Sequence, residues 1–461
     1  MSDLATLIRE YYDAAAEPVT AAEVLERHET SPKPGKGYLR PVWVAAAAAI
    51  VVLVAIGAVG LFGVFRGEGE VVDEPTETTT VTETTVPLGL GSWQRVGADV
   101  MDPVPGILDM TRFGSGLVAV GFDPGAEFDR EGVIFSSEDG VTWSRLAKTD
   151  PALTTGTVLM HGIIEGGSGL VAVGTGCGDE YSCESGPLPT VWTSADGTAW
   201  TRSVVDEAVG TIEDVVATDH GLVGAGWYTI FDGDEVEWVH PAMWLSSDTE
   251  EWTRVWEGQS VAIEEFPPDA NRALALAVGD DGLLVAVGSV ENGSGVEVAA
   301  VWNSTDGRAW EPVDPETPTF GSDTGLAVSM VDVASGPRGF VAVGNEGAVD
   351  VAAWRSADGH SWVRVEAGAD LDDTSEVLTA VAAHGSGWLA AGSADPGFAQ
   401  GPVMLWSSPD GSKWSQVVVF DPGYAMAVVP TDDVIAVAGA VVTDEFHAAV
   451  WGGPPIEPPQ P

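Results

Sequence analysis

Positive charge is scarce in this chain of 461 residues, which has 19 Lys and Arg against 70 Asp and Glu. Nucleic acids and anionic lipids are bound by clustered Lys and Arg, so a net charge of −51 excludes both as partners and favours cations or basic proteins. Only 19% of the residues are charged, however, and 45% are hydrophobic. The composition indicates a folded protein with an acidic surface rather than a disordered acidic chain.

Cysteine is almost absent, since the chain has only Cys177 and Cys183, in "GCGDEYSCES". A structural zinc site would need about two more ligands, and no His or further Cys lies close by in the sequence. The spacing fits a small disulfide loop in an oxidising compartment. We therefore expect a disulfide, with a free or reactive pair as the alternative.

Charge is missing altogether from residues 42–65, "VWVAAAAAIVVLVAIGAVGLFGVF". The run exceeds the roughly 20 residues that cross a bilayer, and it is longer and further from the N-terminus than the apolar part of a cleaved signal peptide. We predict one transmembrane helix. Lys33, Lys36 and Arg40 precede it and acidic residues follow it, so the positive-inside rule predicts a single-pass cell-membrane protein with a cytoplasmic N-terminus and everything after the helix outside.

Three further segments lack the pattern of a folded domain. Residues 1–41 contain two short helical patterns but too few residues for a core of their own, and they are either a passive cytoplasmic tail or a docking site for a cytoplasmic protein partner. Residues 66–91 are rich in Thr and Glu and predict a stalk. Residues 454–461 form a Pro-rich tail.

Residues 92–453 are built from a repeat. A ten-residue pattern such as "VWNSTDGRAW" at 301 occurs six times, and its closing tryptophans are 52 to 58 residues apart. An apolar run such as "GLVAVG" at 116 occurs seven times. A period of this length holding several short strands is typical of a β-propeller blade. The sequence therefore predicts an all-β protein with seven four-stranded blades.

The ends of the repeat region predict how the ring closes. The seventh unit stops after "AAVWGG" at 448–453 without a fourth strand, and an isolated "GSWQRVG" at 92–98 matches the missing strand. We expect the N-terminal strand, with Trp93, to complete the last blade, which removes an exposed sheet edge.

The repeated pattern contains S-x-D-G-x-x-W, and each residue type has a local role. The Asp can accept backbone N–H groups of its own turn, the Gly supplies a positive φ, and the Trp can fill the space between blades. The third copy has Thr249 in place of Gly, so we expect a strained or altered turn there.

This pattern resembles the Asp-box, the S-x-D-x-G-x-x-W turn of sialidase-type β-propellers, from which it departs because Asp and Gly are adjacent here. In that family the box joins the two outer strands of a blade on the face opposite the binding or catalytic one. The resemblance therefore implies structural roles for Asp139, Asp196, Asp248, Asp306, Asp358, Asp410, Trp143, Trp200, Trp252, Trp310, Trp362 and Trp414. It does not imply sialidase activity, because the Arg-Ile-Pro motif is missing, tyrosines are few, and six arginines lie in or beside the boxes, at 95, 145, 202, 254, 308 and 364.

Other chemistry has little support in the sequence. The histidines of the repeat region (His161, His220, His240, His360, His384 and His447) lack metal-ligand spacing, and we interpret them as surface residues. Asp232, Asp234 and Glu235 could belong to a calcium site, and diffuse screening of charge by salt is the alternative. No other cofactor is indicated.

The loops between the second and third strands should lie opposite the boxes. They combine acids with aromatic residues, among them Phe128, Tyr181, Tyr228, Phe231 and Trp238. We favour a binding or sensing module for an extracellular protein or glycan. A glycoside hydrolase acting on surface glycans and a transmembrane regulator acting through the cytoplasmic tail are the alternatives.

Overall fold

The computed structural model describes residues 92–456 except for 102–103, 105, 125–129, 147–148, 178–185, 233–234, 259–270, 316, 348–349, 366–375, 395–400 and 443–445. The predicted cytoplasmic tail, membrane helix and stalk lie outside this part of the chain, as does most of the Pro-rich tail. Within the described ranges, no helix is long and apolar enough to cross a membrane.

Each repeat forms an antiparallel sheet in which strands that follow one another in sequence are neighbours. The innermost strands are β2 Gly106–Phe113, β6 Val158–Gly166, β10 Gly210–Thr218, β14 Arg272–Val278, β18 Val328–Gly336 and β22 Glu376–His384. The second strands are β3 Gly116–Pro124, β7 Gly169–Gly176, β11 Gly221–Asp232, β15 Leu284–Glu291, β19 Gly339–Glu346, β23 Gly387–Ala394 and β26 Ile435–Val442.

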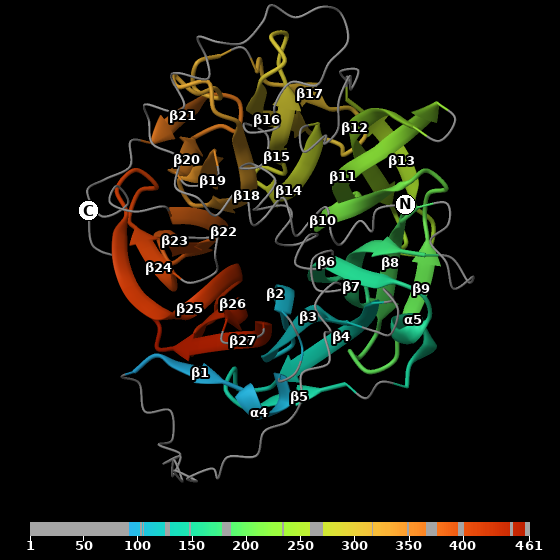
Figure 1. Cartoon of the computed structure of the whole chain (residues 1–461), viewed down its shortest axis with the longest axis vertical. Coiled ribbons are helices and arrows are strands. Elements are labelled where there is room, and N and C mark those ends of the chain that lie inside the picture. The colour runs from blue at the N-terminus through green and yellow to red at the C-terminus, as the bar shows by residue number, and fades with distance from the viewer. Residues whose placement is uncertain are drawn as a thin grey trace, which may run out of the picture. The chain divides into compact units, whose positions relative to one another are not determined.

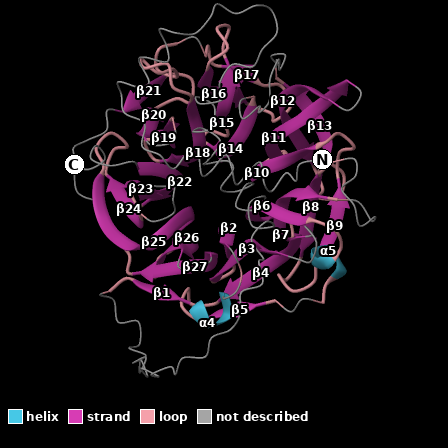
Figure 2. Ribbon diagram, in the orientation of Figure 1, coloured by secondary structure: helices cyan, strands magenta, loops and turns pink. Residues whose placement is uncertain are grey.

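The outer half of each sheet carries the box turn. The third strands are β4 Arg130–Ser137, β8 Leu188–Ser194, β12 Glu235–Ser246, β16 Glu297–Ser304, β20 Asp350–Ser356, β24 Pro402–Ser408 and β27 Phe446–Gly453. The outermost strands are β5 Trp143–Arg145, β9 Thr201–Val204, β13 Thr253–Glu257, β17 Glu311–Pro312 and β21 Trp362–Val365. Two short helices, α4 Ala98–Met101 and α5 Pro151–Thr154, lie in segments between sheets and were not predicted (Figure 2).

The last two sheets share one long strand. The first half of β25 Ser415–Pro430 pairs with β24 as the outermost strand of the sixth sheet, and its second half pairs with β26 as the innermost strand of the seventh. β1 Gln94–Val96 then pairs with β27, with Arg95 opposite Trp451. The predicted closing strand is confirmed: six four-stranded sheets are joined by a seventh that combines both ends of the repeat region.

The sheets follow one another around a ring (Figure 1), and each innermost strand contacts the next until β25 returns to β2. Hydrophobic clusters lie between neighbouring sheets, for example where Val118 and Val120 of β3 meet Met160 of β6 and Trp192 of β8. This packing explains the continuous apolar runs, because a second strand covered on both faces has no side that faces water. The described residues thus form a seven-bladed β-propeller, as predicted.

The antiparallel order gives the ring two different ends. Turns between first and second strands and the box turns lie at one end, which we call the box end. Loops between second and third strands, and the links from one blade to the next, lie at the other, which we call the loop end. Each innermost strand therefore begins at the loop end.

Candidate functional site

Every innermost strand carries a β-bulge at the same place, close to its start. In each bulge, one residue has no pairing partner in the second strand. Its side chain therefore does not follow the alternation of side chains between the two faces of the sheet. These seven residues, which we call the bulge ring, are Leu108, His161, Glu213, Leu274, Val331, Thr379 and Met426. The fold thus places one side chain from each blade around the centre of the ring.

The bulge ring lines a cavity of about 270 Å³. The same cavity is lined by residues that follow the bulges, including Asp109, Asp214 and Asp332, which we call the channel carboxylates. Since the bulges lie near the start of each innermost strand, the cavity occupies the part of the central channel that is nearest the loop end. Polar members of the bulge ring come from blades 2, 3 and 6, and the other four blades contribute Leu, Leu, Val and Met.

His161 and Glu213 form a pair across the interface between blades 2 and 3. The Nδ1 atom of His161 lies 2.6 Å from Oε2 of Glu213, and the two side chains are only 6% and 10% exposed. The other carboxylate oxygen, Oε1, accepts a hydrogen bond of 2.8 Å from Nε1 of Trp227. Burial disfavours the charged form of Glu213, but the charge of His161, its hydrogen bond and the charge of Arg272 lower the pKa of that carboxyl.

The second nitrogen of this imidazole is unsatisfied. Nε2 of His161 is buried and has no hydrogen-bond partner. Because Glu213 accepts at Nδ1, the network assigns a proton to that nitrogen. A buried polar atom without a partner costs about 1–3 kcal/mol. The interpretation of His161 as a surface residue was wrong, because the bulge turns this side chain inward.

The channel carboxylates connect neighbouring blades. Asp214 accepts hydrogen bonds of 2.7 Å from the amides of Val215 in its own strand and Leu276 in β14. Asp109 and Asp332 make the same pair of bonds, to Met110 and Ile163 and to Val333 and Val381. At the equivalent position of the other four innermost strands stand Gly162, Ala275, Ala380 and Ala427. The three carboxylates therefore link blade 1 to 2, 3 to 4 and 5 to 6.

The surroundings of these carboxylates favour their neutral form. Burial raises the pKa of Asp109 to about 7, assisted by the charge of Asp214, against the two backbone hydrogen bonds that lower it. Burial likewise raises the pKa of Asp214 to about 6 and that of Asp332 well above its usual range. The pKa values of Asp109 and Asp214 thus lie near or just below neutral pH.

The other blade interfaces have different polar links. His161 and Glu213 join blades 2 and 3, the hydroxyl of Ser335 donates to the carbonyl of Val278 between blades 5 and 4 at 2.5 Å, and Thr379 donates to Ala425 between blades 6 and 7 at 2.8 Å. Arg112 closes the circle by donating to the carbonyl of Pro430. Every blade interface therefore has at least one such link.

The box aspartates lie at the opposite end of the ring and bind their own turns. Asp306 accepts hydrogen bonds of 2.8 and 3.0 Å from the amides of Arg308 and Ala309. Equivalent bonds are made by Asp139, Asp196, Asp248, Asp358 and Asp410. Each box Trp packs between its own blade and the preceding one, as Trp362 does against Val285 and Trp354.

Thr249 keeps the box turn in its usual shape despite its side chain. Its φ is 71°, close to the 70° of Gly307 and the 72° of Gly359 at the same position. The turn is therefore strained rather than differently shaped, because a β-branched residue in this conformation is disfavoured by about 1–2 kcal/mol.

Replacing Thr249 by Gly is expected to stabilise the propeller by about 0.5–1 kcal/mol, since relief of this strain exceeds the extra freedom that Gly gives the unfolded chain. Chemical denaturation of the variant would measure the change. The matched reverse substitution is Gly197→Thr, at a φ of 77°, which should destabilise by about 1–2 kcal/mol. A destabilised Thr249→Gly variant would contradict the strain argument.

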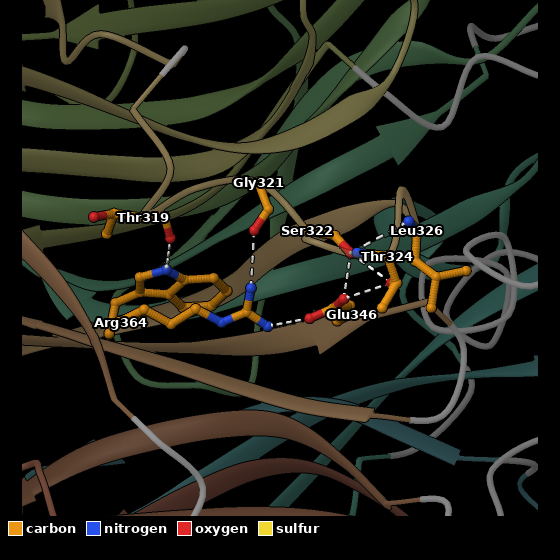
Figure 3. A network of polar contacts seen from close by, with 8 residues as sticks. Thr319, Gly321, Ser322, Thr324, Leu326, Glu346 and Arg364 are labelled. Atoms are coloured by element: carbon orange, nitrogen blue, oxygen red, sulfur yellow. Dashed lines mark hydrogen bonds and ion pairs between the residues drawn. The ribbon is translucent and has the colours of Figure 1, made fainter.

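The arginines beside the boxes have a structural explanation. Arg364 lies opposite Trp354 in the pairing of β20 with β21, and its guanidinium is 5.6 Å from the centre of that ring. Figure 3 shows Arg364 donating to the carbonyl of Gly321 and to Glu346, which also accepts from Ser322. Arg145, Arg202 and Arg254 occupy the same register position opposite Phe135, Trp192 and Trp244. The described partners of these arginines belong to their own blade or to the link that precedes it.

Several predicted site residues are only partly described. Cys177 is disulfide-bonded, and Cys183 lies outside the described residues. Asp232 pairs with Glu235 in the hairpin of β11 and β12, but their side chains and Asp234 are outside the described part, so calcium binding there stays a prediction. No group of three or more His, Cys, Asp and Glu side chains that could hold a metal ion occurs among the residues that are described.

Tyr228 does not belong to a ligand-facing loop as expected. It is 4% exposed and stacks on His240, with ring centres 5.0 Å apart. Its hydroxyl donates to Glu257 at 2.7 Å, and Arg254 lies 3.7 Å above its ring. Burial raises the pKa of Tyr228 to about 12, with Glu257 acting in the same direction. Phe128 and Tyr181 lie outside the described residues.

Sequence reasoning missed the channel site, although a signal exists. When the innermost strands are aligned with one another, "LMHGI" and "TIEDV" place His161 and Glu213 where "RALAL" and "YAMAV" have Leu274 and Met426. A polar residue at a position that is otherwise apolar in a repeat indicates a special role. Without the bulge, however, strand alternation gives no reason to bring these side chains to the centre.

Known proteins resemble this one only in fold. No protein-family model matches the chain, and no curated protein matches its sequence. A sialidase of Trypanosoma rangeli in complex with sialic acid is 15% identical, with a TM-score of 0.42, covering 79% of this chain and 59% of that one. The α-L-arabinofuranosidase Arb93A from Fusarium graminearum is 12% identical, with a TM-score of 0.43, covering 78% and 97%. A protein of unknown function from Dyadobacter fermentans is 12% identical, with a TM-score of 0.42, covering 79% and 98%.

Proposed function

We propose that the propeller is a binding module whose ligand enters the central channel from the loop end. The observation that supports this is the 270 Å³ cavity itself, whose wall takes one side chain of the bulge ring from every blade and includes His161, Glu213 and the channel carboxylates. Ligand sites usually measure about 300–1,000 Å³, so this one suits a small molecule or a single side chain of a larger partner.

Binding fits the cavity better than hydrolysis does. A glycoside hydrolase uses one carboxylic acid to protonate the leaving group and a second carboxylate as base or nucleophile. Each channel carboxylate already accepts two backbone amides, one from each of two blades. The positions of these carboxylates are therefore explained by their structural role, which is to hold strands of neighbouring blades together.

The proposal includes the membrane topology that the sequence predicts. The helix at 42–65 anchors the chain in the cell membrane, the 66–91 stalk separates the propeller from it, and the acidic surface faces the exterior. A ligand bound in the channel could then act on a cytoplasmic partner through residues 1–41, which is the regulator that the sequence leaves open.

The experiment combines topology with ligand capture. Protease added to intact cells should release the propeller by cutting the stalk, whereas protection until the membrane is broken would contradict the placement.

The detergent-solubilised full chain is then screened on glycan and protein arrays beside two variants. Leu274→Trp has a larger side chain that fills the cavity, and Asp219→Trp lies in an exposed box-end turn. A ligand that the first variant loses and the second keeps supports channel binding. Equal capture by Leu274→Trp and the unaltered chain would overturn it.

A further inference from the structure

Exposed basic side chains are gathered in one part of the propeller. In the described part of the chain, the exposed Lys and Arg residues are Arg112, Arg308, Arg338, Arg355 and Lys413. Arg112 donates to the carbonyl of Pro430. The side chains of the others have no hydrogen bond or ion pair within the described residues, and all of them lie at the box end of blades 4 to 6.

Arg338, Arg355 and Lys413 form one group across blades 5 and 6, which we call the basic patch. Arg338 lies in the turn between β18 and β19, and Arg355 is the second-last residue of β20. Lys413 lies in the box turn of blade 6, as does Asp410. Burial opposes ionisation of Asp410, but amides of its turn and then the charges of Arg355 and Arg338 lower the pKa of this carboxyl. The two arginines of blade 5 are therefore close to the turn that carries Lys413.

The basic patch is not balanced by acids like those of other box-end turns. Exposed acids of these turns, beyond the box aspartates, occur in blades 1 to 4 and in blade 7, at Glu138, Glu165, Asp219, Glu250, Glu251, Asp280, Asp281, Asp432 and Asp433. In blades 5 and 6 the turns read "SGPRG" at 335, "ADGHS" at 357, "HGSG" at 384 and "PDGSK" at 409, with Asp358 and Asp410 as their acids. Both aspartates already accept amides of their own turns. A group of exposed cations in a chain of net charge −51 therefore fits an acidic binding partner.

The chain enters the propeller next to this patch. β27 ends at the box end, and β1 runs antiparallel to it, with Gln94 opposite Gly452. The residues before Trp93 therefore reach the propeller at the box end. Trp93 packs on Phe420, with ring centres 5.4 Å apart, and Phe420 belongs to the outermost strand of blade 6. The entry point thus lies beside the blade that carries Lys413.

The segment that leads to this point is acidic. Residues 68–83 contain no Lys or Arg, and their acids are Glu68, Glu70, Asp73, Glu74, Glu77 and Glu83. Residues 84–91 connect this segment to the propeller, and an extended linker of this length spans at most roughly 26–29 Å. Because both partners belong to one chain, their effective concentration is high, and several individually weak ion pairs suffice to hold them together.

We propose that the acidic segment 68–83 binds the basic patch, so that the stalk lies against the box end at blades 5 and 6. This interaction fixes the direction in which the propeller is held, which goes beyond the proposed binding of a ligand. The box end then faces the predicted membrane helix, and the loop end with its cavity faces away from it. An unattached stalk would not determine which end of the ring faces outward.

Zero-length cross-linking of the detergent-solubilised full chain tests this contact. A carbodiimide activates a carboxylate, and an amine that touches it displaces the activating group to form an amide. Lys413 is the amine of the basic patch, so peptide mass spectrometry should find it coupled to an acid of residues 68–83 at about 0.01 M NaCl. At about 1 M NaCl the Debye length falls from about 30 Å to about 3 Å, and the yield should fall at least about fivefold. Absence of any link from Lys413 to this segment at low salt would overturn the proposal.

Substitutions show whether the charges of the patch hold the stalk. The double variant Arg338→Glu with Arg355→Glu leaves Lys413 in place but should lower its coupling to the stalk at least about fivefold. Arg338→Lys keeps the charge, so its new amine should couple to the same segment. The control is Asp219→Lys, in an exposed box-end turn of blade 3, whose amine should couple to no residue of 68–83.

Melting curves show whether the double variant is folded, and the two introduced lysines carry the test if it is not. Equal coupling of the stalk to Arg338→Lys and to Asp219→Lys would contradict the proposal, because the stalk would then have no preference for the patch.

Two further measurements separate the stalk from other acidic partners. Mixing chains labelled with light and heavy nitrogen shows whether a link joins one chain or two, and a link between chains assigns the patch to a second copy. The cross-linking is then repeated in vesicles of phosphatidylcholine with and without phosphatidylserine. An unchanged yield supports the stalk, whereas loss of the link in the anionic vesicles assigns the patch to lipid headgroups. Either reassignment would refute the docking of the stalk and leave the proposed ligand site in the channel standing.

Discussion

Removing the closing strand is expected to lower the free energy of unfolding by several kcal/mol, because β1 and the preceding Trp93 contribute to two cores at once. Val96 is 5% exposed and belongs to the cluster between the last and first blades. Trp93 packs on the cluster between the sixth and seventh blades, edge-on to Phe420 with ring centres 5.4 Å apart. Loss of the strand also exposes the edge of β27, which can then pair with other chains.

Denaturation measures this by comparing a chain that begins at residue 90 with one that begins at residue 100. Within the full chain, Trp93→Ala should cost about 2–4 kcal/mol, somewhat less than a fully buried Trp because its ring is only partly buried. Gln94→Ala changes an exposed neighbour in the same strand and should be nearly neutral. Equal unfolding midpoints for the long and short chains would show that the ring does not depend on β1.

Replacing Asp214 by Ala should have an effect of similar size for a different reason. The substitution leaves the amides of Val215 and Leu276 without their acceptor and cuts the link between blades 3 and 4. Each unsatisfied amide costs about 1–3 kcal/mol, and channel water can replace part of the loss, so about 2–4 kcal/mol is expected. Asp219→Ala, in an exposed turn of the same blade, is the control and should be nearly neutral.

The same carboxylates set the response to pH. The folded-state pKa of Asp109 is raised to about 7 and that of Asp214 to about 6, above the value of about 3.9 for an unfolded chain. The folded state therefore binds more protons between about pH 4 and 7, and stability falls as the pH rises through that window. The box aspartates affect stability below this pH window, because backbone hydrogen bonds lower the pKa of, for example, Asp306. Their contribution to the free energy of unfolding is lost as the pH falls.

Unfolding free energy should thus be highest near about pH 4–5. In Asp214→Asn the decline between pH 4 and 7 should become shallower, because one of the groups that bind extra protons is gone. Denaturant titrations at a series of pH values measure this slope. A decline as steep as that of the unaltered chain would mean that Asp214 titrates as it does in the unfolded state.

The sequence by itself determined the repeat and hence the fold. Six box patterns and seven apolar runs predicted seven blades, and the unmatched "GSWQRVG" predicted the pairing of β1 with β27. These inferences succeed because box turns, tight turns and apolar strands depend on interactions within about ten residues. The same locality made the positive φ of Gly307 and the backbone bonds of Asp306 predictable.

Only the tertiary structure decided where the candidate site lies. His161, Glu213 and Asp214 come from two blades and meet because a bulge in each innermost strand turns a side chain toward the centre. Nothing in a strand's local pattern specifies that bulge, and distance along the chain gives no hint that Asp214 bonds the amide of Leu276, 62 residues away. Closure of the ring brings these groups together, and their burial at its centre is what raises the pKa of the channel carboxylates.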